Sequence, residues 1–170
     1  MKQLYTILIL LVFTTVVAAI SEPEPQSSET KVLARYSGTW QSDIVIRPSG
    51  RQQTAFKNAE WVLNEQYLQA TIKSGESETF EMHRYHPKDN VYQKWIFTSS
   101  GRNGLWLGSW DEQTETMTWK FGSDSRNGTK VDRFISEDKY EGEMIIKDAS
   151  GKILVNVELV LTRVKPQSKK

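Results

Sequence analysis

The feature that most constrains this chain is a two-residue alternation of apolar and polar side chains, which recurs in ten short runs. Short links rich in Gly, Pro, Asn, Asp and Ser separate the runs, as in "PSG" at 48–50 and "DASGK" at 148–152. These residue types suit the tight turns between antiparallel strands. The links leave no room for crossover helices, so successive runs are expected to be neighbours in one sheet.

A meander of this length is expected to close on itself, because closure removes the exposed edge strands. The pattern therefore predicts an all-β fold, a ten-stranded antiparallel up-and-down β-barrel with a short N-terminal capping helix. The helix is expected over residues 28–36, where Val32, Leu33 and Tyr36 share one face. The predicted strands comprise residues 40–47, 54–63, 67–73, 78–85, 91–98, 104–110, 116–121, 129–135, 139–147 and 153–164.

The first residues have the composition of an export signal. Met1 and Lys2 form a short basic start, residues 4–20 carry no charge, and residues 17–19 are small enough for a signal peptidase. We therefore predict a signal peptide over residues 1–19, cleaved after Ala18 or Ala19, and an exported protein, periplasmic or extracellular. The alternative is a retained anchor, although the uncharged stretch is short for a bilayer span. After cleavage no stable membrane insertion is expected.

The rest of the chain divides into three parts by composition. Residues 20–30 are predicted to be a flexible linker, residues 31–165 the barrel, and residues 166–170 a basic tail. A formal net charge of +1 argues against nucleic-acid binding, which needs a basic surface to neutralise phosphates. The chain has no Cys, which excludes disulfides, a thiolate nucleophile and cysteine-linked lipid. The oligomeric state is left open.

The first and last strands are expected to meet at a Trp–Arg contact. Alternate residues of the last run are apolar and share one face, which Arg163 continues. Because a closed meander pairs its last strand with its first, Arg163 is expected to lie over the indole of Trp40. The guanidinium is then also placed to bind backbone carbonyls of the capping helix.

These residues carry a resemblance to a known family. Gly38-Thr39-Trp40 on a first strand, with Arg163 ending the last, resembles the structural signature of lipocalins and calycins. The wider chain is similar to the bacterial lipocalin-like family called domain of unknown function 1579, through "SGTW", "YHPKDNVYQKWIFTSSG" at 85–101 and "SGKILVNVELVLTRVK" at 150–165. The resemblance implies a small barrel, often secreted. It implies no particular activity.

The sequence offers little support for metal or cofactor chemistry. His83 and His86 are three apart, so on one strand they would face opposite sides and could not share an ion. We expect two surface or turn histidines. A haem-binding barrel of the nitrobindin type has a similar architecture and needs one axial His, but neither His lies in a supporting motif. No metal site and no cofactor are predicted.

Nucleophilic catalysis is equally unsupported. The Gly-x-Ser-x-Gly elbow of serine hydrolases is missing, and "SGRNG" at 100–104 is hairpin chemistry, not a phosphate-binding loop. Glu141 and Glu143 share a strand face, but this face also carries Lys147 and is expected to be solvated. No catalytic residue is predicted.

Two arginines are the candidate polar groups of an internal site. Arg84 shares a strand face with Phe80 and Met82, and Arg133 shares one with Val131 and Ile135. If these apolar residues point inward, the guanidinium groups do so too, and they would need an anion such as a ligand carboxylate. The alternative is that both arginines lie outside, paired with acids such as Asp132 or Glu81.

Aromatic residues either line a cavity or fill the core. Trp95 and Phe97 share a face, Trp119 and Phe121 share another, and Trp106 and Trp110 flank Gly108 on a third. The speculative ligand-binding set is therefore Arg84, Arg133, Trp95, Phe97 and Trp119. The predicted function is non-catalytic binding of a small apolar or amphipathic ligand in the barrel. The alternatives are a structural or interaction module with a filled core and, less favoured, an enzyme that uses the barrel cavity.

Overall fold

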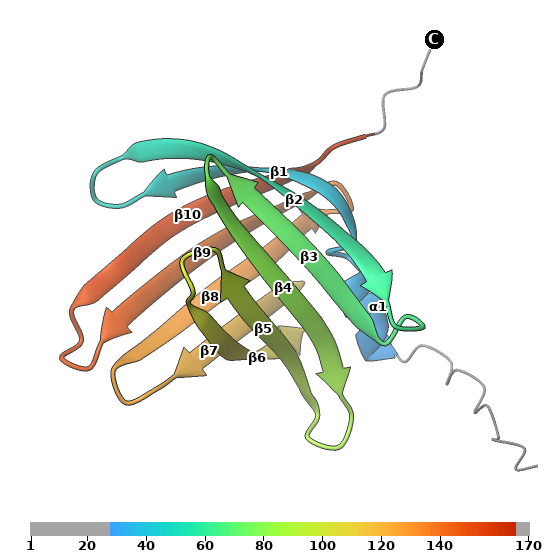
Figure 1. Cartoon of the computed structure of the whole chain (residues 1–170). Helices are drawn as coiled ribbons and strands as arrows, with labels where there is room; N and C mark the ends of the chain where they lie inside the picture. The colour runs from blue at the N-terminus through green and yellow to red at the C-terminus, as the bar shows by residue number, and fades with distance from the viewer. Residues whose placement is uncertain (1–27, 166–170) are drawn as a thin grey trace, which may run out of the picture.

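The structure is a computed structural model that describes residues 28–165. It is a closed antiparallel barrel in which β1 pairs with both β2 and β10, and every other strand pairs with its neighbours in sequence (Figure 1). Within the described residues, no helix has the length and apolar character to cross a membrane. The predicted signal peptide, most of the predicted linker and the basic tail lie outside the described residues.

The elements follow the sequence pattern closely. They are α1 (Ser28–Ala34), β1 (Gly38–Ile46), β2 (Arg51–Val62), β3 (Tyr67–Ser74), β4 (Ser77–His86), β5 (Val91–Thr98), β6 (Asn103–Asp111), β7 (Thr116–Gly122), β8 (Arg126–Ser136), β9 (Lys139–Asp148) and β10 (Ile153–Arg163). The predicted fold class, with ten strands and one short helix, is confirmed. Residues 28–30, predicted as the end of the linker, form the start of α1.

The helix α1 covers one end of the barrel (Figure 1). Leu33 in α1 and Tyr36 just after it are each 1% exposed, so the apolar face of this segment is buried against the barrel. We call this the capped end. Five hairpin links, at 47–50, 75–76, 99–102, 123–125 and 149–152, surround the opposite, uncapped end.

The predicted closure contact is present. Trp40 pairs in register with Arg163 across β1 and β10, and its side chain is fully buried. The guanidinium carbon of Arg163 lies 4.2 Å from the Trp40 ring centre. The same guanidinium donates hydrogen bonds to the backbone carbonyls of Arg35 and Ser37, which follow α1 directly. Arg163 therefore joins the closing strands to the capping segment.

Gly38 makes this close approach possible. Its φ of +100° lies in a region that L side chains rarely adopt, and a Cβ there would be 2.5 Å from Nη1 of Arg163. The aromatic core of the capped end lies beside this contact. Tyr36 packs edge-on against Phe134 and Tyr140, with ring centres 4.9 Å and 5.4 Å apart.

Candidate functional site

A layer of ionisable side chains crosses the barrel interior below the aromatic core. Most of its members are less than 9% exposed, which is unusual for charged residues. We call it the charged layer; it comprises Lys57 of β2, Glu81 and His83 of β4, Lys94 of β5, and Lys130 and Asp132 of β8.

Strand geometry places these residues together. Glu81 and His83 are two apart on β4 and so share its inner face, as do Lys130 and Asp132 on β8. Lys94 is the cross-strand partner of His83, which brings β5 into the same layer.

Glu81 is the acceptor for two neighbours. Lys57 Nζ lies 3.4 Å and His83 Nε2 3.0 Å from Glu81 Oε2. Burial alone would raise the pKa of Glu81, but the ammonium groups of Lys57 and Lys94 and the His83 hydrogen bond hold it well below its ordinary value. Glu81 is therefore ionised at neutral pH, and its charge is matched by Lys57.

Asp132 is the second buried carboxylate. Lys130 Nζ forms an ion pair with Asp132 Oδ1, and the Tyr36 hydroxyl donates a hydrogen bond of 3.0 Å to Oδ2. Burial opposes ionisation, yet the neighbouring cations, Lys130 first, lower the pKa of Asp132 below its ordinary value. Its charge is matched by Lys130.

His83 is neutral and has one free ring nitrogen. Burial lowers its pKa to about 4, although the carboxylate of Glu81 acts in the opposite direction. Because Glu81 is ionised, Nε2 of His83 carries the proton and donates it to this carboxylate. The Nδ1 atom is buried and has no hydrogen-bond partner among the described residues.

Lys94 is the cation without a carboxylate of its own. Its side chain is 2% exposed, and its ammonium lies 4.3 Å from the Trp119 ring centre and 5.4 Å from that of Trp106. Burial lowers its pKa to about 7, against the attraction of Glu81. Three lysines share two carboxylates in this layer, and Lys94 is the surplus cation.

On the uncapped side of the charged layer, inner-face side chains are less fully buried than in the aromatic core. Inward-facing apolar residues of four strands are only partly buried there: Ile72, Ile96, Phe121, Met144 and Ile146. All of them except Ile72 pack against the buried core. The Phe121 and Trp106 rings are 4.4 Å apart. An apolar body at this end would therefore contact apolar side chains, with the charged layer as its floor.

Four of the five predicted site residues lie on the outer wall. Arg133 is exposed, and Arg84 donates a 2.7 Å hydrogen bond to Gln93 while its guanidinium lies 5.4 Å from the Trp95 ring centre. Phe97 is 48% exposed. The expected inward orientation of these residues is wrong, because Phe80 and Met82 face outward with Arg84 while the charged residues of β4 face inward.

The other expectations have mixed outcomes. Trp119 is fully buried and lies inside the barrel, as expected. His83 is buried and not a surface or turn residue, whereas His86, at the end of β4, contacts Asp89 at 3.1 Å. The charged layer was not predicted from the sequence. The one indication in the sequence is a lysine with small residues on the same strand face, Ala55-x-Lys57-x-Ala59, which is typical of an inner face.

Two solved structures share the fold. The chain aligns with the S-type phycobiliprotein lyase CPES from Guillardia theta at 15% identity and a TM-score of 0.53, covering 85% of this chain and 96% of that one. It aligns with Rv2717c from M. tuberculosis at 10% identity and a TM-score of 0.61, covering 83% and 100%. The chain is a lipocalin-like barrel, and at these identities the likeness shows the fold alone. No family model and no curated protein matches the chain.

Proposed function

We propose that this barrel binds a small amphipathic acid without catalysing a reaction. The carboxylate of the ligand lies beside Lys94, and its apolar part extends toward the uncapped end. The observation that carries the proposal is the surplus buried lysine next to inward-facing apolar side chains that are only partly buried.

The energetic argument concerns an unmatched charge. A buried ammonium is destabilising unless a hydrogen-bonded counter-charge accompanies it. Cation–π contacts with Trp119 and Trp106 offset part of this cost for Lys94, but the two carboxylates are already bonded to other lysines. A ligand carboxylate supplies the missing negative charge.

The enzyme alternative is less well supported. A carboxylate that orients a His, with the second ring nitrogen free, is the arrangement of many general bases. Here the pKa of His83 is about 4, so its Nδ1 is a weak proton acceptor at neutral pH. The geometry therefore favours binding. An interaction module remains the second candidate, because Phe97, Leu105 and Leu107 are more than 40% exposed on the outer wall.

Export and family membership also belong to the proposal. The signal-peptide pattern over residues 1–19 supports an exported protein, periplasmic or extracellular. The three stretches that include Trp40, residues 85–101 and Arg163 support membership of the domain of unknown function 1579 family.

The test compares an acid with its alcohol. Decanoate and decanol are titrated into the protein while Trp emission is followed, since Trp119 and Trp106 contact Lys94. We expect decanoate to bind about tenfold or more tightly than decanol, because only the acid forms an ion pair. In Lys94→Met the preference should disappear.

The control is Lys147→Met, which removes an exposed lysine from the outer face of β9 and should keep the preference. Native mass spectrometry of protein purified from its own source would identify a resident ligand. Equal affinity of the wild type for acid and alcohol, or equal weakening of both by Lys94→Met, would contradict the proposal.

A further inference from the structure

The outer wall of β4, β5 and β6 carries a continuous apolar surface. Its members adjoin one another across the strands: Trp95 pairs with both Met82 and Leu105, and Phe97 pairs with Phe80. Phe97, Leu105 and Leu107 are 48%, 43% and 46% exposed. Large apolar residues gathered on one side of a small barrel are characteristic of an interaction surface. We call this surface the apolar wall.

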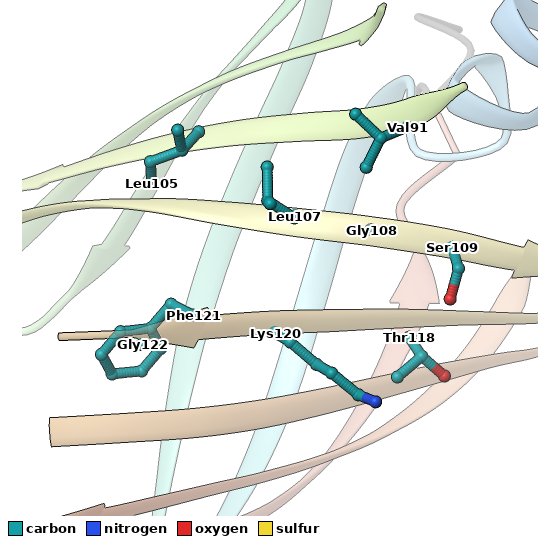
Figure 2. A pocket seen from close by; sticks show the side chains of 9 residues that line it. All are labelled: Val91, Leu105, Leu107, Gly108, Ser109, Thr118, Lys120, Phe121 and Gly122. Atoms are coloured by element: carbon teal, nitrogen blue, oxygen red, sulfur yellow. The ribbon is translucent and has the colours of Figure 1, made fainter. Parts of the chain in front are cut away.

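A shallow groove of about 570 Å³ runs along the apolar wall between β6 and β7. Figure 2 shows Val91, Leu105 and Leu107 on one side of it and the ammonium of Lys120 on the other. The pairing of β6 with β7 begins at Leu107 and Lys120 and continues to the capped end. Leu105 lies on the uncapped side of this first pair and has no partner on β7. The groove thus places an apolar floor next to a cation.

Two cations, Arg84 and Lys120, adjoin the apolar wall, while Asp111 lies at the capped end of the outer face of β6. Arg84 bonds only to the neutral Gln93 and Tyr67, and neither Arg84 nor Lys120 forms an ion pair among residues 28–165. Glu78, at the uncapped end of β4, lies 3.7 Å from Lys73. The opposite side of the barrel carries exposed Asp43, Glu141, Glu143 and Glu158 on β1, β9 and β10, where Lys139 pairs with Glu141 and Arg47 pairs with Glu158.

We propose that the apolar wall docks peripherally on the surface of an anionic phospholipid bilayer. Leu105, Leu107 and Phe97 enter the boundary between headgroups and acyl chains, and Lys120 and Arg84 meet lipid phosphates. Trp95 beside Arg84 suits this depth, since indole rings favour the membrane interface. The exposed carboxylates Asp43 and Glu143, on β1 and β9, then face away from the negative surface.

Charge decides between a bilayer and a second copy of the chain. A two-fold dimer through the apolar wall would bring the basic groups of one copy toward those of the other, and like charges across an interface are unfavourable. An anionic bilayer instead offers a counter-charge to every cation on this face.

The first experiment measures vesicle binding of the full chain. We expect sedimentation with phosphatidylglycerol vesicles, weaker binding to phosphatidylcholine vesicles, and weakening by salt. Leu105→Ser/Leu107→Ser should lower the affinity about tenfold or more through lost apolar burial, and Lys120→Glu should lower it several-fold. Two matched controls, Phe56→Ser on β2 and Lys147→Glu on β9, should leave it within about twofold, because both residues lie away from the wall.

The second experiment locates the contact on the barrel itself, because the apolar residues 4–20 of the full chain could also bind vesicles. Because the chain has no Cys, single cysteines at Leu105→Cys and Phe56→Cys can carry a fluorophore that reports an apolar surrounding. Phosphatidylglycerol vesicles should shift the emission to shorter wavelength at position 105 and not at position 56. Equal responses at both positions would overturn the proposal. So would a dimer in solution that Leu105→Ser/Leu107→Ser dissociates, since the wall would then belong to a second copy.

Discussion

Trp40 and Arg163 hold the point at which the barrel closes. Trp40 donates a 3.0 Å hydrogen bond from its indole nitrogen to the carbonyl of Tyr36. Arg163 lies on the Trp40 ring and donates hydrogen bonds to the carbonyls on either side, those of Arg35 and Ser37. One aromatic side chain thus contacts the first strand, the last strand and the capping segment. Its removal would disturb all three.

We predict that Trp40→Ala lowers the free energy of unfolding by about 3–5 kcal/mol, as for other fully buried aromatic residues. A urea melt followed by circular dichroism measures this loss. Trp95→Ala is the control, because Trp95 lies partly exposed on the outer wall and its truncation leaves no interior cavity. Similar losses for the two variants would contradict the role given to Trp40.

At the scale of the elements, the sequence predicted the strands but not which face of each lies inside. Alternation and turn residues depend on neighbours along the chain, and these give the strand order and most strand boundaries to within one residue. The strands β2 and β8 begin three residues earlier than predicted. The inner face of β4 carries Glu81 and His83 in place of Phe80 and Met82. The outer face of β4 is therefore the more apolar one, and a prediction from apolar residues alone takes it for the inner face.

The buried carboxylate of β4 takes its counter-charge from another strand, whereas that of β8 takes it from its own strand. Glu81 is matched by Lys57 of β2, and Asp132 of β8 by Lys130 and Tyr36. Such pairs depend on the register of the closed barrel, which a single sequence does not reveal. The site was missed because two of its contacts, Lys57–Glu81 and Tyr36–Asp132, join residues that are far apart in the sequence. The Trp40–Arg163 contact was predictable because closure itself requires it.

The capping segment is tied to β8 through one polar contact. The Tyr36 hydroxyl donates to Asp132 Oδ2, and both groups are buried. We predict that Tyr36→Phe lowers the free energy of unfolding by about 1.5–3 kcal/mol, the usual range for a hydrogen bond to a charged group. Chemical denaturation measures the change. Tyr85→Phe should change it much less, because the Tyr85 hydroxyl bonds to Asn90 in the exposed link between β4 and β5.

At the scale of the whole molecule, the charged layer couples folding to pH. The pKa of His83 is about 4 in the folded chain against 6.5 ordinarily, so between these values only the unfolded chain takes up the proton. Stability therefore falls as pH decreases through this window, by on the order of 3 kcal/mol for the full shift. The lowered pKa of Glu81 adds a further loss below its ordinary value of 4.5.

Above neutral pH the lowered pKa of Lys94 makes the barrel more stable as the pH rises. Its pKa is about 7 in the folded chain against 10.5 ordinarily, so from pH 7 upward the folded chain has released a proton that the unfolded chain retains. The free energy of unfolding should therefore rise with pH until tyrosines of the unfolded chain begin to ionise. Burial raises the pKa of Tyr36 and Tyr140, and stability falls again once unfolded tyrosines ionise above about pH 10.

We therefore predict a stability maximum near about pH 9 in place of the usual optimum between about pH 5 and pH 8. Urea melts across the pH range measure the free energy of unfolding. Lys94→Met should be more stable than the wild type at neutral pH, since it buries no unmatched ammonium, and should lose the rise above pH 7. His83→Gln keeps a donor for Glu81 and should lose the decline between pH 6.5 and 4. A wild-type profile that is flat above pH 7, or one that rises equally in Lys94→Met, would show that Lys94 is not the surplus buried cation on which the proposed ligand site depends.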